Sequence, residues 1–331
     1  MQRIRRSGRA LAMLTAGAFL ALGAPPSGAL AQASVAIANF GPHGSLQQVI
    51  DGFKQALADN GYVEGEGVVY DYSDGNFDPS LIPQILSSLE AGDPDLMFTI
   101  TTPVSQAAVT LVRDQDIPIV FAPVTDPVNA GLVPSWEQGS DRFVGASNMQ
   151  STAAVLDFAA TLLGRDIDSF GVLFNPGDAN DVVGRDLAQA EADARDIELV
   201  AVSVESPNDI QQRVTALGDV DFIYAIPSSM LQPALPAVAS AADRAGIPII
   251  SSSPQGVEQH VALAAMSVPW DQVGYEAGVR AARILDGAAP SDLDNYRPTP
   301  EDHAPAISLR RMEHFGLEVP DALADCGCLI E

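Results

Sequence analysis

Short apolar runs alternate with amphipathic segments along most of the chain. Residues 35–40 form an apolar run that ends in Gly41-Pro42, and the apolar residues of 46–57 recur every three to four positions, as on one face of a helix. The same alternation predicts strands at 35–40, 68–72, 95–100, 117–122 and 143–146, and helices at 46–57, 81–89 and 104–112. Such a pattern is typical of βαβ units, in which helices cover both faces of a parallel sheet.

The same order starts again after Asn148. It predicts strands at 170–174, 199–204, 222–226 and 247–250, and helices at 182–194, 210–217 and 231–242. Similar short sequence segments also recur in the two halves, and the first strand of each half ends in an asparagine, Asn39 and Asn175. An internal duplication explains this, although chance similarity between two βαβ units is the alternative. We therefore expect an α/β protein with two Rossmann-like lobes built on parallel sheets.

Residues 1–31 have the features of a secretory signal peptide. Four arginines lie within residues 3–9, an apolar run covers 10–24, and Ala29-Leu30-Ala31 has the small residues of a cleavage site. The alternative is an uncleaved membrane anchor, which needs about 20 apolar residues, whereas this run is shorter and contains Gly17 and Gly23. No cysteine for lipid attachment lies near the cleavage site. We expect a soluble periplasmic protein that begins near residue 32 and has no lipid anchor.

The charge balance is strongly acidic. The chain has 17 basic and 43 acidic residues, a formal net charge of −26, and loss of the four arginines near the start would bring it to −30. Such a protein repels a phosphate backbone, so we expect no nucleic-acid partner. Adaptation to salt and the codon use of a GC-rich genome both explain the acidity. Lys54 is the only lysine, and its place on a predicted helix face favours solvation over chemistry.

The strand ends provide the candidate binding residues. Ligands of open parallel sheets bind outside the carboxyl ends of the strands, so two facing lobes enclose a cleft between these ends. The residues that follow the predicted strands, and the asparagine at the junction of the two halves, are therefore candidate ligand-binding residues. They are Asn39, Phe40, Thr101, Thr102, Asp126, Asn148, Asn175, Asp178, Asn180, Ser228 and Ser229.

Three of these loops carry specific chemistry. Thr101-Thr102-Pro103 begins a predicted helix, where free backbone N–H groups and the helix dipole suit a carboxylate, although plain helix capping explains the motif too. Residues 175–180 offer amide and carboxylate groups that suit a polar head or an amine, or only an Asx turn. Asp126 precedes Pro127, so its carboxylate either faces the cleft or shapes the turn.

The other reactive side chains form no catalytic or metal-binding pattern. Cys326 and Cys328 could close only a very small ring, and we expect them in a frayed tail without function. The sequence lacks G-x-S-x-G, H-E-x-x-H, a P-loop and G-x-G-x-x-G after a strand, so we expect no enzyme, no metal and no cofactor. Histidines are expected at the surface or at helix caps, and tryptophans either in the core or as a stacking wall of the cleft. These residues are His43, His260, His303, His314, Trp136 and Trp270.

Several longer segments carry motifs in a characteristic order. They are Gly52-Phe53, Gly61-Tyr62-Val63-Glu64-Gly65, and residues 94–103, 117–132, 171–180, 208–211 and 274–287. Together they resemble the ABC transporter substrate-binding proteins of the TrpX type, over nearly all of residues 32–331. The resemblance implies a type I periplasmic-binding-protein fold, with two lobes joined by three crossing strands as a hinge. It also implies that a small ligand is captured for an inner-membrane permease, and some relatives take aromatic amino acids.

The resemblance also implies lobe boundaries, and the chain departs from the family pattern at one position. The N-terminal lobe is expected to contain residues 32–148 and about 268–300, and the C-terminal lobe residues 149–267 and about 301–331. The family pattern has an Asp-Asn pair after the third strand of the second lobe, where this chain has Ser228, Ser229 and Met230. An acid that could pair with a ligand amine is thus absent there, unless Asp126 or Asp178 takes its role.

We therefore expect the periplasmic solute-binding component of an ABC importer. It would act as a monomer and would bind a small polar or aromatic metabolite, with amino-acid-like molecules among the candidates. An extracytoplasmic sensor that docks to a receptor kinase is the alternative from a different class. A secreted enzyme on a doubly wound fold is a third, which the missing motifs disfavour.

Overall fold

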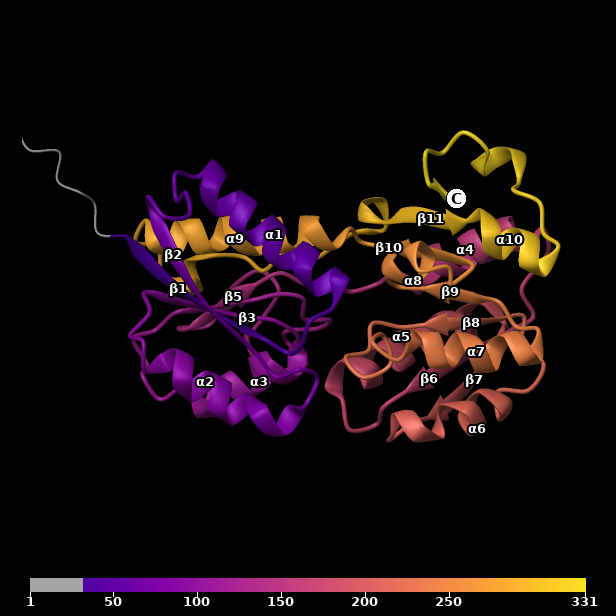
Figure 1. Ribbon diagram of the computed structural model, residues 1–331, viewed down its shortest axis with the longest axis horizontal. Helices are drawn as coiled ribbons and strands as arrows, with labels where there is room; N and C mark the ends of the chain where they lie inside the picture. Colours follow the sequence, from indigo (N-terminus) through magenta and orange to yellow (C-terminus); the bar gives the residue numbers. More distant parts are fainter. Residues whose placement is uncertain (1–31) are drawn as a thin grey trace, which may run out of the picture. The chain divides into compact units, whose positions relative to one another are not determined.

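The computed structural model describes residues 32–331, and the predicted signal peptide lies outside the described residues. Within them the strands form two sheets (Figure 1). The first sheet is parallel and has the order β2-β1-β3-β4-β5. Its strands are β1 (Ala33–Asn39), β2 (Val68–Asp74), β3 (Leu96–Thr99), β4 (Ile119–Phe121) and β5 (Phe143–Gly145).

Helices cover both faces of this sheet. They are α1 (Gly44–Asp59), α2 (Ile82–Glu90), α3 (Thr102–Leu111) and α9 (Trp270–Leu285). Successive side chains of a strand point to opposite faces. Val35 and Ile37 of β1 therefore pack in the same apolar cluster as α1 and α9, whereas Ala36 and Ala38 pack with α2 and α3. We call this sheet and these four helices the N-terminal lobe.

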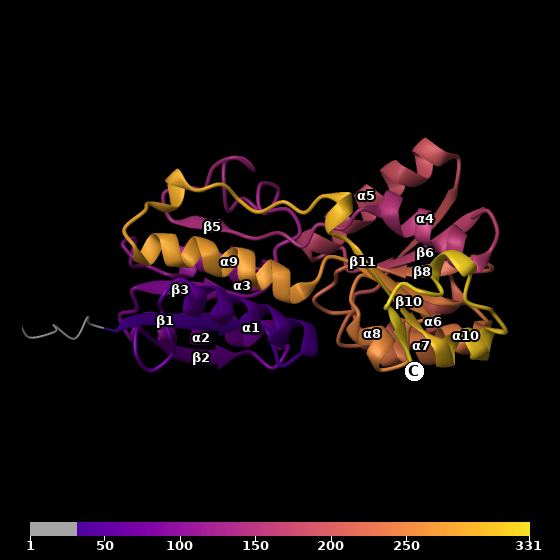
Figure 2. The same cartoon turned by 90° about the horizontal axis from the view of Figure 1, so that it is seen from above.

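Helix α9 joins this lobe from far along the chain. It lies beside α1 in both views (Figure 1 and Figure 2). The two backbones approach closely because glycines occupy the contact: a Cβ added at Gly274 would lie 2.0 Å from the carbonyl oxygen of Val49, and one at Gly52 would lie 2.0 Å from that of Asp271. The close contact between the two helices therefore depends on the missing side chains.

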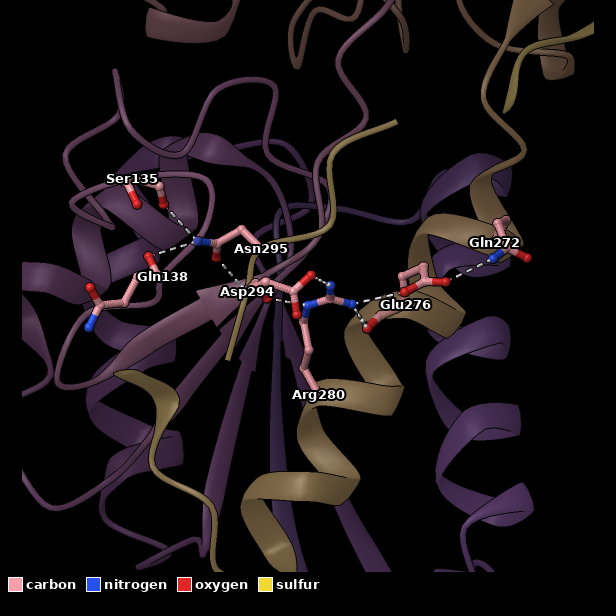
Figure 3. A network of polar contacts seen from close by, with 8 residues as sticks. Ser135, Gln138, Gln272, Glu276, Arg280, Asp294 and Asn295 are labelled. Carbon is pink, nitrogen blue, oxygen red and sulfur yellow. Dashed lines mark hydrogen bonds and ion pairs between the residues drawn. The ribbon is translucent and has the colours of Figure 1, made fainter. Parts of the chain in front are cut away.

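Polar contacts hold the segment after α9 against the first sheet (Figure 3). Arg280 of α9 donates from Nε to the carbonyl oxygen of Asp294, at 2.7 Å, and from Nη2 to its carboxylate, at 3.1 Å. The neighbouring Asn295 donates to two carbonyl oxygens of residues 135–138, at 3.0 Å each, and accepts the N–H of Gly145 in β5 at 3.1 Å. These three bonds use both amide hydrogens of the buried Asn295 and one acceptor site of its oxygen.

The second sheet has seven strands in the order β12-β11-β10-β9-β8-β6-β7. These are β6 (Ser169–Phe174), β7 (Glu198–Ser203), β8 (Phe222–Ala225), β9 (Ile249–Ser251), β10 (Ala264–Ser267), β11 (Ala304–Ser308) and β12 (Leu329–Ile330). Helices α4 (Thr152–Leu163), α5 (Ala179–Arg195) and α10 (Leu309–Phe315) cover one face, and α6 (Ile210–Thr215), α7 (Leu235–Ala245) and α8 (Gln255–Glu258) the other. We call this sheet with these six helices the C-terminal lobe.

One pair of strands departs from the parallel pattern expected from the sequence. β10 and β11 are antiparallel, because the chain leaves the second sheet after β10, forms α9 on the N-terminal lobe, and returns as β11. The other neighbours in this sheet are parallel. The order β7-β6-β8-β9-β10 matches the order of the first sheet strand for strand.

The chain passes between the lobes three times within the described residues, after β5, after β10 and before β11. The first and third passages are bonded to each other. Ser147 donates its N–H to the carbonyl oxygen of Tyr296 at 3.0 Å, and Ser151 donates its N–H to Nε2 of His303 at 2.9 Å. These two passages therefore form a short joined ribbon between the sheets.

The strands and helices predicted from the sequence are present, with two notable differences. The helix predicted at 231–242 begins only at Leu235, because Gln232 turns its amide towards the carbonyl oxygens of Ala225 and Ile226. The C-terminal tail is not frayed: Cys326 and Cys328 form a disulfide, and β12 pairs with β11. Among residues 32–331 no helix combines the length and apolar character needed to cross a membrane.

Candidate functional site

The two sheets offer equivalent positions for a ligand. In each, the strand order reverses beside the first strand, between β1 and β3 in one lobe and between β6 and β8 in the other. Ligands of doubly wound sheets bind at such switch points, outside the carboxyl ends of the strands. The segments that follow β1, β3, β6 and β8 contribute side chains to one cavity.

The cavity draws its lining from both lobes. The lining combines apolar residues with uncharged polar residues, and none of its side chains is acidic, lysine or arginine. The lining consists of Phe40, His43, Leu46, Phe77, Thr101, Thr102, Pro123, Thr125, Asn148, Asn180, Pro227, Ser228, Ser229, Gln232, Pro233 and Trp270.

Aromatic rings form much of the wall on the N-terminal lobe. Phe40 and Phe77 meet edge to face with their centroids 5.9 Å apart, and Trp270 contributes from the first turn of α9. Burial lowers the pKa of His43 to about 4, so this ring is neutral at pH 7. The wall therefore suits a flat or apolar group and brings no positive charge to it.

The start of α3 presents donors to the cavity. Thr101 and Thr102 line it, and within the described residues the backbone N–H groups of Thr101, Thr102 and Val104 meet no acceptor. The Oγ1 of Thr101 is also buried without a partner there, on a residue that is only 6% exposed. Free N–H groups at the positive end of a helix dipole attract an anion. This corner of the cavity suits a carboxylate.

Three further buried polar atoms in the cavity lining have no partner among residues 32–331. They are Oδ1 of Asn148, Oδ1 of Asn180 and Nε1 of Trp270. The orientation of Asn180 is fixed, because its Nδ2 donates to Oδ1 of Asp181 at 3.0 Å and to the carbonyl oxygen of Pro227 at 2.9 Å. Its oxygen is therefore an unused acceptor, whereas the indole N–H is an unused donor. Leaving such groups unpaired is costly unless a ligand or water completes them.

Two carboxylic acids lie close to the cavity, Asp181 behind its lining and Asp178 beside it. Asp181 has no exposed surface and accepts hydrogen bonds from the N–H of Asn175 at 2.7 Å and from Oγ of Ser228 at 2.8 Å. Burial raises its pKa to about 8, against the effect of these bonds. Burial also raises the pKa of Asp178 to about 6. Within residues 32–331 no group of three or more His, Cys, Asp or Glu side chains is arranged to hold a metal ion.

The structure brings most of the predicted site residues together. Phe40, Thr101, Thr102, Asn148, Asn180, Ser228 and Ser229 line the cavity. Asn175 and Asp178 line an adjoining groove, which Phe40 and Ser229 share with the cavity.

Asn39 and Asp126 lie elsewhere. Asn39 is buried at the end of β1, where its Nδ2 donates to the carbonyl oxygen of Gly41 and to the hydroxyl of Tyr72, at 3.0 Å each. Asp126 accepts the N–H groups of Val128 and Asn129 at 3.0 Å, which shapes the turn. Of the two roles considered for Asp126, the structure thus shows the turn.

Sequence reasoning missed several lining residues. His43 was expected at the surface or a cap, and Phe77 and Gln232 were not considered. For Trp270 the sequence allowed either a core position or a place in the cavity wall. The structure shows both, since Trp270 packs in the core cluster and also lines the cavity.

The buried Asp181 was also missed, although the sequence holds a signal for it. Asp181 shares an inward stripe of α5 with Gly184, Ala188 and Ala192. An acid on such an apolar stripe is unusual and marks a buried charge.

Comparison with known proteins identifies the class. The family model for ABC transporter substrate binding proteins matches residues 34–324, so the chain belongs to this family. The "Tyrosine-binding protein" of Clostridioides difficile (strain R20291) is 30% identical over 263 residues, which cover 79% of this chain and 75% of that protein. The fold is that of type I periplasmic binding proteins.

Two solved structures add to this. An ABC domain from Streptococcus pneumoniae in complex with L-Trp is 24% identical with a TM-score of 0.83, covering 90% of this chain and all 100% of that one. A ligand-free, open substrate binding protein with adhesive properties from Clostridium difficile is 26% identical with a TM-score of 0.69, covering 90% and 99%. The chain is thus similar to substrate-binding proteins along nearly its whole described length.

Proposed function

We propose that this protein is the solute-binding component of an ABC importer and captures an α-amino acid with an aromatic or other large apolar side chain. The observation that carries the proposal is the set of buried, unpaired polar atoms in a cavity whose other side chains are aromatic, aliphatic or uncharged polar. Thr101, the start of α3 and the indole N–H of Trp270 supply donors for a carboxylate. Asn180 and Asn148 supply acceptors for an ammonium group.

The rest of the cavity accounts for the side chain of the ligand. Phe40, Phe77 and Trp270 provide apolar surface and stacking partners, and no charged side chain of the described residues enters the lining. The tyrosine-binding relative and the tryptophan complex support the same ligand class. Sugars and nucleosides fit less well, because they would leave the donor corner at Thr101 without an anion.

Capture follows from closure of the two lobes. A ligand that bridges them stabilises the closed state through its differential affinity for that state. The lobes also touch directly, since Oγ of Ser45 in α1 lies 2.7 Å from Oγ of Ser253 in the C-terminal lobe. We propose that an inner-membrane permease recognises the closed protein and that a partner ATPase supplies the energy.

Location and lobe limits belong to the same proposal. Residues 1–31 would direct export and be removed, which leaves a periplasmic protein without a lipid anchor. The N-terminal lobe would comprise residues 32–148 and 268–300, and the C-terminal lobe 149–267 and 301–331. The placement of α9 and of the Arg280 network on the first sheet supports these limits.

A thermal-shift screen tests the ligand class. Purified residues 32–331 are heated with each of the amino acids, and with sugars, nucleosides and small carboxylates as comparison sets. We expect L-tyrosine, L-tryptophan or L-phenylalanine to raise the melting temperature, because a ligand at 100 times its Kd adds about 2.7 kcal/mol. Small-angle scattering should then show compaction with that ligand. A shift with sugars or nucleosides alone would reject the proposal.

A further inference from the structure

Asp181 is a fully buried carboxylic acid beside the cavity, with a role that the proposed binding mode leaves open. It lies in the first turn of α5 and has no exposed surface. No ion pair within residues 32–331 involves it. A buried acid without a basic partner is strongly disfavoured in its charged form. A buried carboxylic acid at this position therefore calls for a functional explanation.

The contacts of Asp181 orient two residues of the cavity wall. Its Oδ1 accepts Nδ2 of Asn180 at 3.0 Å, which leaves Oδ1 of Asn180 buried and unpaired in the lining. Its Oδ2 accepts Oγ of Ser228 at 2.8 Å, and that hydroxyl in turn accepts the N–H of Leu231 at 3.0 Å. With its proton committed to Asp181, Ser228 has one remaining lone pair and no donor to offer the cavity.

We propose that Asp181 is a positioning residue for the ammonium group of the ligand: it holds Asn180 and Ser228 as acceptors and provides the buried negative charge that this cation faces. The inference rests on the proposed function, because it assumes that an amino acid occupies the cavity. It assigns recognition of the amine to a carboxylate one layer behind the lining, although the lining itself has no acid.

Protonation of Asp181 is the natural state without a ligand cation. The titratable group that acts on it is Asp178, one turn before it, and this second negative charge raises the pKa of Asp181 further. The loops packed against it contribute Asn175 and Ser228, which do not titrate, and His43 in the cavity lining is neutral at pH 7. Burial raises the pKa of Asp181 to about 8, so most molecules carry the proton at pH 7.

A proton on Asp181 has one available hydrogen-bond acceptor, Oγ of Ser228. The N–H of Asn175 and Nδ2 of Asn180 can only donate, so a protonated Asp181 donates to Oγ of Ser228. Ser228 then turns its own hydroxyl hydrogen elsewhere and becomes a donor, which an ammonium group disfavours. An ammonium ligand therefore selects the ionised form of Asp181, and binding near pH 7 releases a proton.

Calorimetry with matched ligand pairs tests the positioning role. The probes are L-tyrosine and L-tryptophan, and their counterparts without the amine, 3-(4-hydroxyphenyl)propionate and indole-3-propionate. In Asp181→Asn we expect the amino acids to bind at least tenfold more weakly, whereas the two propionates bind within twofold of wild type. The matched control is Asp193→Asn on the exposed side of the same helix, which should bind all four like wild type.

A second measurement needs no variant. The binding enthalpy of the wild-type protein at pH 7, compared between buffers of different ionisation enthalpy, should show release approaching one proton per amino acid and none per propionate. Equal losses for amino acids and propionates in Asp181→Asn, or no proton release by the wild type, would overturn the inference while leaving the proposed function intact. If neither amino acid binds the wild type, the proposed function itself fails, and the inference with it.

Discussion

Thr101 has a backbone conformation that non-glycine residues rarely adopt. Its φ is 82° and its ψ is 154°, in a region that is open almost only to glycine and costs a side chain about 1–3 kcal/mol. This turn connects β3 to α3 and places a buried hydroxyl and free N–H groups at the cavity. The strain thus lies where the donor corner is built, and the rest of the lobe has to stabilise it.

Replacement of this residue should separate stability from binding. In Thr101→Gly the strain is removed, so we expect the free energy of unfolding of the ligand-free protein to rise by about 1 kcal/mol, less the entropic cost of glycine. Affinity for the amino acid should fall, because the Oγ1 donor is lost. Urea unfolding and calorimetry measure the two effects. Thr110→Gly, on the exposed part of α3, is the control and should only destabilise. A Thr101→Gly protein that is less stable would contradict the assignment of strain.

Asp181 should make the ligand-free protein less stable as pH rises. An acid with a raised pKa binds its proton more tightly in the folded chain than in the unfolded chain, so the free energy of unfolding falls as pH rises towards the folded pKa of about 8. The fall is at most about 1.4 kcal/mol per pH unit. The effect of Asp181 on the free energy of unfolding is best isolated between pH 6.5 and 8. Asp178, with a pKa of about 6, changes this free energy mainly below pH 6.5. His43 and His303 also act mainly below pH 6.5, and because their pKa values are lowered, their effect has the opposite sign.

Urea unfolding at several pH values between 6.5 and 8.5 checks this slope. In Asp181→Asn the free energy of unfolding should depend less steeply on pH, since the amide does not titrate. An equal slope in the variant would assign the effect to other groups.

At the scale of elements, local pattern predicted what lies within one strand or helix. The apolar run Val35, Ala36, Ile37 and Ala38 marks a strand buried on both faces, and the βαβ pattern predicts parallel strands. Nothing local says that residues 270–285 pack on α1, more than 200 positions earlier in the chain, or that β11 runs against β10. Those contacts depend on long-range packing at glycines and on the path of the chain between the lobes.

The contact between α1 and α9 gives a prediction with a definite sign. Gly→Ala within an exposed helix stabilises by up to about 1 kcal/mol, so a gain is the default expectation. In Gly274→Ala the new methyl group would meet the carbonyl oxygen of Val49 at 2.0 Å, and the helices must separate. We expect the free energy of unfolding to fall by about 2 kcal/mol or more. Urea unfolding measures it, and Gln272→Ala on the exposed side of α9 is the control, with a change within about 0.5 kcal/mol. A stabilised Gly274→Ala protein would refute close packing.

At the scale of the whole molecule, the site was predictable only as far as strand ends define it. The rule that ligands bind at carboxyl ends located Thr101, Asn180 and Ser228, because each lies between the end of a buried strand and the first turn of the next helix. It could not find Trp270, which reaches the cavity from the start of a helix that lies between two strands of the other lobe in the sequence. It also passed over Asp181, which acts from behind the lining. Such residues join the site through tertiary packing alone.

The two lobes also contact each other without the help of a ligand. At the start of α1, Oγ of Ser45 lies 2.7 Å from Oγ of Ser253, and the N–H of Ser45 donates to Oε1 of Gln255 at 3.3 Å. Gly44 leaves room for this approach, since a Cβ there would lie 2.8 Å from Nε2 of Gln255. We expect these bonds to break when the lobes open. They therefore add to the stability of the closed state and should act on release more than on capture.

Ser45→Ala tests this interlobe contact. One hydrogen bond contributes about 0.5–1.5 kcal/mol, so the closed complex should lose two- to tenfold in affinity. We expect the ligand to bind first to the open form, with Ser45 and Ser253 apart, so the association rate should be unchanged and the dissociation rate should change by the whole effect. Stopped-flow fluorescence with L-tryptophan or L-tyrosine resolves the two rates. Ser87→Ala, an exposed serine on α2 of the same lobe, is the matched control and should leave both rates unchanged. Weaker binding through slower association, with dissociation unaffected, would mean that the Ser45 contact shapes the open form and does not hold the lobes together.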